Sequence, residues 1–352
     1  MPKDLGFAVT GLGMGKHHCM AIETAPGAEL VAVCDVDEER LQPVAEQYDC
    51  KAYTSFGDLL QDEDVDVVNL ATPSGMHAAM GIEAAAAGKH LIVEKPADIA
   101  VGRIDELLAA GQQHGAKISC IFQARCVPLN LRIREAIQAG RLGKLVGIHG
   151  AVPWYRQQSY YEGPHGTWKG TWDMDGGGSL MNQGVHTVDL IQWFGGPVET
   201  VAGMFGVFEH EIEAEDQTVA ILQFASGALG TLHTTTCYYP GYDQRVAVYG
   251  SAGSIIKEEG ALVSWRLAGD EDGKEEQELM DLYGASGQKS GAVDPMAVSF
   301  DGHTQIVADM VEAIREEREP AITLASARHA VEIVNAIYEA GRTGGRVQLG
   351  TG

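Results

Sequence analysis

Two stretches of the sequence carry side chains whose types and spacing could do chemistry at a substrate oxygen. One is Lys95, which follows the apolar run Leu91–Val93. The other contains Asn182, His186 and Asp189, whose i, i+4 and i+7 spacing would place them on one helical face. An ammonium group can stabilise a developing alkoxide, and an imidazole can take a proton near neutral pH. Together the two stretches are suited to proton transfer at a hydroxyl or carbonyl.

Both stretches also have plainer interpretations. Lys95 can be a surface lysine ion-paired with Glu94, and a single histidine on a helix is more often a structural residue than a catalyst. However, the run 91–93 is short and rich in branched residues, which predicts a buried strand. Pro96 disfavours helix at the preceding residue, so we expect Lys95 at the carboxyl end of that strand. Open parallel sheets bind ligands at this edge.

A glycine-rich turn near the N-terminus has the context of a dinucleotide-binding site. A predicted strand over residues 5–10 runs into the turn, and a helical pattern over 19–24 follows. In this context the glycines let the backbone approach a pyrophosphate at a helix N-terminus. Lys16 holds the place of the third glycine of the usual fingerprint, and glycine turns without a nucleotide are common. The turn residues predicted to bind the cofactor are Gly11, Gly13, Met14 and Gly15.

Asp35 ends the next predicted strand, over residues 30–34, at 20 residues beyond Gly15. The fingerprint expects an acid at this distance, bound to the adenosine ribose. The following residues, 36–39, include three acids and no Arg or Lys, which favours NAD over NADP. The alternative is that Asp35 caps the next helix.

The first third of the chain alternates short apolar runs with helical patterns. Strands are predicted over 5–10, 30–34, 65–71, 90–94 and 117–122, with helices over 38–48, 78–87 and 104–114. This alternation predicts a doubly wound parallel sheet, a Rossmann domain over residues 1–124. Two of its strand ends add predicted cofactor contacts at one sheet edge: Thr72, Pro73, His77, Glu94 and Lys95.

The remainder, residues 125–352, predicts an α+β domain. Helices are predicted over 129–139, 303–317 and 325–342, and strands over 145–155, 200–208, 218–236 and 245–256, with a hairpin turn at 225–228. These runs indicate a large, mostly antiparallel sheet, one face of which needs a cover, either helices or another subunit. Residues 267–295 are acidic and glycine-containing, which predicts an irregular surface segment. Aromatic residues upstream of the glycine–histidine block could stack on a sugar ring.

Composition narrows the class of protein. Asp and Glu number 49 against 25 Lys and Arg, so nucleic acid and anionic membranes are poor partners. There is no run of about 18 apolar residues and no room for a signal peptide before the first strand, so we expect a cytoplasmic protein. The 6 cysteines show no CxxC spacing and are expected as buried thiols; no metal site is predicted.

Four blocks of the sequence resemble the Gfo/Idh/MocA oxidoreductase family, the relatives of glucose–fructose oxidoreductase and inositol dehydrogenase. In order they are 11–18, Thr72-Pro73 with His77, Glu94-Lys95-Pro96, and the block GGG-x-L-x-N-x-G-x-H-x-x-D at 176–189. The resemblance implies bound NAD(P) and a sugar or polyol substrate. It also implies a C-terminal domain for substrate binding and oligomerisation, whose open-faced sheet forms a homodimer or homotetramer. It also implies that Lys95 bonds the reacting oxygen and that His186 is the catalytic acid/base. Many dehydrogenases of the family carry Asp where this chain has Asn182, and an amide cannot act as a base.

The sequence therefore predicts hydride transfer between a sugar or polyol hydroxyl and the nicotinamide. Lys95, His186 and Asn182 are the catalytic candidates. The candidate substrate contacts are Gln123, Arg125, Tyr155, Trp172, Asn182, His186 and Asp189. Two alternatives are a non-catalytic NAD- or sugar-binding regulator and a metal-dependent lyase or hydrolase, although no HExxH or Cys/His cluster supports the latter. Substrate identity and reaction direction do not follow from the sequence.

Overall fold

The computed structural model describes residues 3–163, 167–284 and 301–350. Its internal contacts divide the chain into two compact units. The first contains Met1–Gln123 and Ser299–Arg328, and the second contains Ala124–Val298 and His329–Gly352. A C-terminal segment that lies within the predicted 125–352 domain thus clusters with the N-terminal unit. The roles predicted for the two domains stay predictions.

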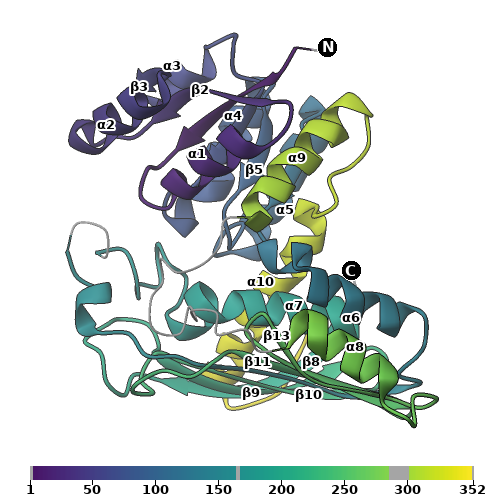
Figure 1. Cartoon of the computed structure of the whole chain (residues 1–352). Helices are drawn as coiled ribbons and strands as arrows, with labels where there is room; N and C mark the ends of the chain where they lie inside the picture. The colour runs from purple at the N-terminus through teal and green to yellow at the C-terminus, as the bar shows by residue number, and fades with distance from the viewer. Residues whose placement is uncertain (1–2, 164–166, 285–300, 351–352) are drawn as a thin grey trace. The chain divides into compact units, whose positions relative to one another are not determined.

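The first unit is built on a six-stranded parallel sheet with strand order β3-β2-β1-β4-β5-β6 (Figure 1). This is the order of a doubly wound dinucleotide-binding sheet, so the predicted Rossmann architecture is confirmed. The strands are β1 Leu5–Thr10, β2 Ala28–Cys34, β3 Lys51–Tyr53, β4 Val67–Leu70, β5 His90–Val93 and β6 Ile118–Cys120. All four residues of β4 are buried, as expected where helices cover both faces of a parallel sheet.

Helices connect these strands at the predicted places. They are α1 Gly15–Thr24, α2 Glu38–Tyr48, α3 Phe56–Leu60, the 3₁₀ turn η1 Ser74–Met76, α4 His77–Ala86 and α5 Val101–His114. Asp37 caps α2 by accepting hydrogen bonds from the backbone N–H groups of Glu39 and Arg40. The short elements β3 and α3 are absent from the sequence prediction, because elements of three and five residues show no clear periodicity.

A helix from near the C-terminus completes the first unit. Helix α9, Asp301–Arg315, packs against α1 (Figure 1). The hydroxyls of Thr24 and Thr304 are hydrogen-bonded at 3.0 Å, and Ser119 Oγ donates to the carbonyl of Ile322 at 2.9 Å. The first contact holds the start of α9 close to the helix that follows the glycine turn, and the second ties the segment after α9 to β6.

The second unit contains an eight-stranded sheet with order β13-β12-β11-β7-β10-β9-β8-β14. Only β7 and β10 pair in parallel, so the prediction of a mostly antiparallel sheet is confirmed. The predicted hairpin at 225–228 joins β9 to β10, where Gly227 has a φ of +82°. The strands are β7 Leu145–Pro153, β8 Val198–Gly206, β9 Gln217–Phe224, β10 Leu229–Thr235, β11 Arg245–Gly250, β12 Gly253–Glu258, β13 Ala261–Leu267 and β14 Val347–Gln348.

Two predictions in this unit are wrong in detail. The single strand predicted over 245–256 is a hairpin, because β11 and β12 pair across the turn at Ser251 and Ala252. The irregular segment predicted over 267–295 contains α8, Lys274–Tyr283, whose amphipathic pattern is masked by its acidic composition. Residues 285–295 of that prediction lie outside the described residues.

Helices cover one face of this sheet (Figure 1). Besides α8 they include α6 Pro128–Gln138 and α7 Val185–Gly195; the unit also holds the C-terminal part of α10 Leu324–Thr343 and the short turns η2 Gln123–Cys126, η3 Gln158–Tyr160 and η4 Ser179–Gly184. Burial alternates along β9: Ala220 and Leu222 are buried, whereas Val219 and Ile221 are at least half exposed. The sheet therefore has the predicted open face, with apolar side chains on it. Within the described residues, no helix has the length and apolar character needed to cross a membrane.

Candidate active site

Lys95 lies where the sequence places it, immediately after the carboxyl end of β5. It is partly exposed and is joined to Pro96 by a cis peptide bond. Its backbone N–H donates to Oε2 of Glu94 at 2.9 Å. The carboxylate of Glu94 thus fixes the backbone from which the Lys95 side chain extends.

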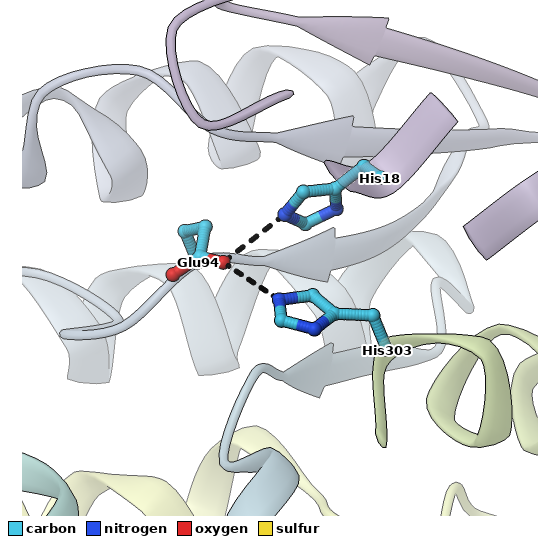
Figure 2. A group of neighbouring side chains, drawn as sticks. All are labelled: His18, Glu94 and His303. Atoms are coloured by element: carbon cyan, nitrogen blue, oxygen red, sulfur yellow. Dashed lines mark hydrogen bonds and ion pairs between the residues drawn. The ribbon is translucent and has the colours of Figure 1, made fainter. Parts of the chain in front are cut away.

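Glu94 is the centre of a buried cluster drawn in Figure 2. Its Oε1 accepts hydrogen bonds from Nε2 of His18, on α1, at 3.1 Å and from Nε2 of His303, on α9, at 3.4 Å. Burial alone would raise the pKa of Glu94, but these two donors hold it well below its ordinary value. The carboxylate is therefore ionised near neutral pH, and it links helices α1 and α9 to the strand that carries Lys95.

Asn69 determines which ring nitrogen of His18 carries the proton. Its Nδ2 donates to Nδ1 of His18 at 3.0 Å, so that nitrogen carries a lone pair and the proton lies on Nε2, facing Glu94. Burial lowers the pKa of His18, although Glu94 opposes this effect. His18 is consequently a neutral donor to an ionised carboxylate.

At two positions of the glycine turn, neighbouring atoms leave no room for a Cβ, whereas at a third position there is room. Gly11 has a φ of +87°, and a Cβ there would lie 2.6 Å from the carbonyl oxygen of Ala71. A Cβ on Gly15 would lie 2.8 Å from Cγ1 of Val9. A Cβ on Gly13 would meet nothing within 4 Å. Packing therefore requires glycine at 11 and 15, whereas the glycine at 13 borders open space.

Asp35 lies at the end of β2 with its carboxylate engaged. Oδ2 accepts from the backbone N–H of Leu12 at 2.7 Å, and Oδ1 accepts from that of Asp37 at 3.0 Å. Arg40 Nη1 also donates to Oδ2 at 3.3 Å, although the sequence analysis finds no cation in residues 36–39. Asp35 thus fixes the glycine turn, and the helix N-cap predicted as its alternative role is Asp37 instead.

His77 joins two of the predicted edge turns. Its Nε2 lies 2.8 Å from the carbonyl oxygen of Thr72, and its Nδ1 lies 2.8 Å from that of Pro96. Both ring nitrogens therefore bind backbone, and His77 positions the turns that contain Thr72, Pro73 and Lys95. Direct contact between His77 and a cofactor stays a prediction.

In the second unit the glycine–histidine block is not one regular helix. Asn182 lies in the π-helical turn η4, and His186 and Asp189 lie in α7. A single α-helical face for these three residues is therefore wrong. π-Helical turns occur frequently at functional sites.

Glu215 holds the start of this helix, and sequence reasoning missed it. Its Oε1 accepts from the backbone N–H groups of Gly178 at 3.0 Å and Leu180 at 2.9 Å, and its Oε2 accepts from Ser179 Oγ at 2.6 Å. A Cβ on Gly178 would lie 1.8 Å from the carbonyl oxygen of Glu215, which explains why this position is glycine. Burial raises the pKa of Glu215, against the effect of these donors.

Arg125 and Asp189, both predicted as substrate contacts, bind each other. Arg125 Nε donates to Asp189 Oδ2 at 2.8 Å, and both side chains are buried. Burial raises the pKa of Asp189, although Arg125 opposes it. Their interaction joins η2 to α7, so the pair orients the helix that carries His186.

The remaining predicted substrate contacts lie in separate aromatic or buried settings. Trp172 packs edge-on against Tyr338 with ring centroids 5.0 Å apart, and Tyr155 packs against Tyr239 at 5.3 Å. Gln123, the last residue of the first unit, has a buried Oε1 without a hydrogen-bond partner among the described residues.

Asn182 belongs to a hydrogen-bonded network in the second unit. Its Nδ2 donates to Oδ1 of Asp175 at 2.7 Å, and its Oδ1 accepts from the hydroxyl of Tyr160 at 3.2 Å and from Nε2 of Gln183 at 2.8 Å. Neither Asp175 nor Tyr160 is among the predicted site residues. No periodic pattern marks them, because they lie in irregular segments upstream of the block.

Two groups of described residues contain three potential metal ligands each: His18, Glu94 and His303, and His210, Asp216 and Cys237. In both groups the histidine and carboxylate atoms are hydrogen-bonded to each other. In the second group, His210 donates from Nδ1 to Asp216 and from Nε2 to the carbonyl of Arg156.

Comparisons with known proteins agree with this architecture. Residues 5–122 match the model of an oxidoreductase family with an NAD-binding Rossmann fold, and residues 130–256 match the GFO/IDH/MocA C-terminal domain. The inositol 2-dehydrogenase of Rhizobium meliloti is 29% identical over 270 residues, which cover 74% of this chain and 78% of that protein. The scyllo-inositol 2-dehydrogenase (NAD(+)) of Bacillus subtilis is 25% identical over 99% of this chain and 97% of its own length.

A solved structure extends the agreement to the whole chain. The WlbA dehydrogenase from Bordetella pertussis, in complex with NADH and UDP-GlcNAcA, is 29% identical, with a TM-score of 0.88 over 100% of this chain and 99% of that one. The first family model covers the Rossmann sheet, and the second covers strands of the mostly antiparallel sheet. The chain therefore belongs to the Gfo/Idh/MocA family of NAD-binding oxidoreductases.

Proposed function

We propose that this protein is an NAD-dependent dehydrogenase that oxidises a hydroxyl of a sugar, polyol or sugar derivative, or reduces the corresponding ketone. The observation that carries the proposal is Lys95, held at the carboxyl end of β5 by a buried, ionised Glu94. The edge that Lys95 occupies is where sheets of this topology bind dinucleotides. The dehydrogenases named above, which act on inositols or bind a sugar nucleotide, support the substrate class.

The glycine turn fits a dinucleotide. The open space at Gly13 is where a backbone without a side chain lets a pyrophosphate approach, and Gly11, Met14 and Gly15 complete the turn. Asp35 would bind the adenosine ribose. Thr72, Pro73, Glu94 and Lys95 would contact the nicotinamide half from the same sheet edge. The bound cofactor supplies the hydride acceptor, and the protein supplies binding, orientation and proton transfer.

We propose NAD rather than NADP as the cofactor. A 2′-phosphate beside Asp35 would meet its carboxylate and those of Asp37 and Glu38. Arg40 is the one cation bonded to Asp35 among the described residues, and it is already paired with Asp35 and Asp37. Measuring kcat/KM with both cofactors tests this choice; a preference for NADP would overturn it.

Lys95, His186 and Asn182 divide the chemistry at the reacting oxygen. Lys95 donates to that oxygen and stabilises its alkoxide character. His186 takes the hydroxyl proton during oxidation and returns it during reduction. Asn182 orients the substrate but takes no proton, because an amide is not a base. Gln123, Arg125, Tyr155, Trp172 and Asp189 complete the proposed substrate site.

The open face of the second sheet is our proposed subunit interface. Val146, Met204, Val219, Ile221 and Leu229 are at least half exposed on this sheet. Apolar side chains gathered on a sheet face favour burial against another subunit. We propose a homodimer or homotetramer, to be measured by sedimentation, and a cytoplasmic location.

The test compares wild type with Lys95→Ala and the exposed control Lys144→Ala on a panel of sugars and polyols, followed by NADH absorbance. Lys95→Ala should lower kcat/KM by about 10²–10⁴-fold while NAD still binds, and the control should not. Near-normal turnover by Lys95→Ala would refute the assignment. A non-catalytic regulator is the second candidate, favoured by the amide at 182; it predicts a sugar–NAD complex without turnover.

A further inference from the structure

The amide of Asn182 has one orientation that satisfies its neighbours. Its nitrogen must face Asp175, because an ionised carboxylate can only accept, and the distance of 2.7 Å is that of a strong hydrogen bond. Its oxygen must face the hydroxyl of Tyr160 and Nε2 of Gln183, which both donate to it. Reversing the amide would place its oxygen against the Asp175 carboxylate and its nitrogen against Nε2 of Gln183, two mismatched pairs.

Asp175 is well placed to impose this orientation. Its side chain is fully buried, and its second oxygen, Oδ2, accepts from the backbone N–H of Gly170 at 2.8 Å. The carboxylate therefore cannot turn without losing a backbone hydrogen bond. It ties the segment before the glycines to the π-helical turn that carries Asn182, one turn before His186.

We propose that Asp175 is a positioning residue that fixes the orientation of the Asn182 amide and supplies the negative charge beside it. The inference rests on the proposed function. The Asn182–Asp175 contact pairs one amide with one carboxylate at 2.7 Å. Asp175 acts through Asn182 and does not itself touch the substrate.

The two residue types can be exchanged in the protein, because the hydrogen bonds described above survive the exchange. An Asp at 182 would accept from Tyr160, from Gln183 and from an Asn at 175. The Asn at 175 would still accept from the N–H of Gly170 through its oxygen. The double variant Asp175→Asn/Asn182→Asp thus keeps one charge and one amide, whereas each single variant does not.

The charged surroundings of Asp175 determine what the single variants should do. Tyr160, Tyr161 and Tyr338 lie within reach of its charge, and burial together with that charge raises the pKa of Tyr160, which stays protonated and donates. Two cations, Arg156 and Lys169, lie over the Tyr160 ring. Asn182→Asp puts a second carboxylate at hydrogen-bond distance from the first, so the pair must share a proton.

The experiment measures kcat, KM and thermal unfolding against pH for wild type, both single variants, the double variant and Asp173→Asn, an exposed control from the same segment. Asp175→Asn should lower kcat by about 10-fold or more with a smaller change in KM. Asn182→Asp should lose kcat progressively as pH rises and the shared proton leaves. The double variant should recover to within about 3-fold of wild type and lose this pH dependence.

Different outcomes would contradict the positioning role of Asp175 and the proposed function. A double variant no more active than the worse single variant, or an unchanged pH profile in Asn182→Asp, would overturn the positioning role. Equal losses of stability in Asp175→Asn and the double variant, with kcat unaffected, would show a purely structural contact. If wild type turns over no sugar or polyol, the proposed function fails, and the positioning role fails with it. The pairing of Asp175 with Asn182 is then tested by stability alone. It predicts that the melting temperature of Asn182→Asp falls with rising pH, whereas that of the double variant does not.

Discussion

Each unit buries a histidine against a carboxylate, and the two pairs have different charge states. In the first unit, Nε2 of His18 donates to Glu94 at 3.1 Å; in the second, Nδ1 of His210 donates to Asp216 at 3.1 Å. Burial lowers the pKa of His18, whereas Asp216, against the effect of burial, raises the pKa of His210 to about 10. An imidazole and a carboxylate at the same distance form a neutral donor with its acceptor in one unit and an ion pair in the other.

The difference comes from the second ring nitrogen. In His18 it accepts from the amide nitrogen of Asn69 at 3.0 Å, so it cannot carry a proton. In His210 it lies 2.9 Å from the carbonyl oxygen of Arg156, which can only accept, so it must carry one. Burial lowers the pKa of His18, and a donor at its second nitrogen acts in the same direction, whereas the second neighbour of His210 can only accept.

The largest expected effect is that of Asp216→Ala. The substitution leaves the buried His210 cation unpaired and removes the acceptor of the backbone N–H groups of Phe208, Glu209 and His210. We expect the second unit to lose about 3–5 kcal/mol of unfolding free energy. All 5 tryptophans lie within residues 124–298, so tryptophan fluorescence in urea reports on this unit. A loss below about 1 kcal/mol would contradict the ion pair.

Glu94→Gln should cost less, because the lowered pKa of its partner His18 keeps that ring neutral. The variant weakens the hydrogen bonds from His18 and His303, so we expect a loss of about 1–3 kcal/mol in the first unit. Hydrogen exchange of the amides in β1 and β4 measures it. The comparison fails if this loss equals or exceeds that of Asp216→Ala.

The pH dependence of stability should have opposite sign in the two units. The lowered pKa of His18 means that its contribution is present above about 6.5 and is lost as pH falls, when the unfolded state takes up the proton. The raised pKa of His210 means that its contribution is complete below about 6.5 and is lost as pH rises toward about 10. Each slope is at most about 1.4 kcal/mol per pH unit. Parallel slopes in fluorescence and hydrogen exchange would rule this out.

The variant with the smallest expected effect tests whether the second neighbour of His18 determines its charge. Asn69→Asp gives His18 an acceptor at its second nitrogen, the arrangement that His210 already has. The pKa of His18 should rise by about 1 unit or more, measured by nitrogen NMR of the imidazole, while that of His210 stays unchanged as the internal control. An unshifted His18 would show that burial, and not the second neighbour, determines its charge.

The elements of the first unit could be predicted because their information is local. Apolar runs of the right length, glycine turns and the acid 20 residues beyond Gly15 follow one another in the chain. The same holds for the hairpin at 225–228 and for the open face of the second sheet, which period-two alternation reveals. The errors fall where elements are short or composition is misleading, as at β3, at the hairpin of β11 and β12 and at α8.

The sequence by itself determined where Lys95, His186 and Asn182 stand relative to strand ends and helix starts, because neighbours along the chain fix those positions. It did not reveal which groups would face them. His303 meets Glu94 across 209 residues, and Glu215 meets Gly178 across 37. Only the tertiary structure decided those contacts, because hydrogen bonds and burial depend on distances in space. No periodic pattern in the sequence identifies the partners of these side chains.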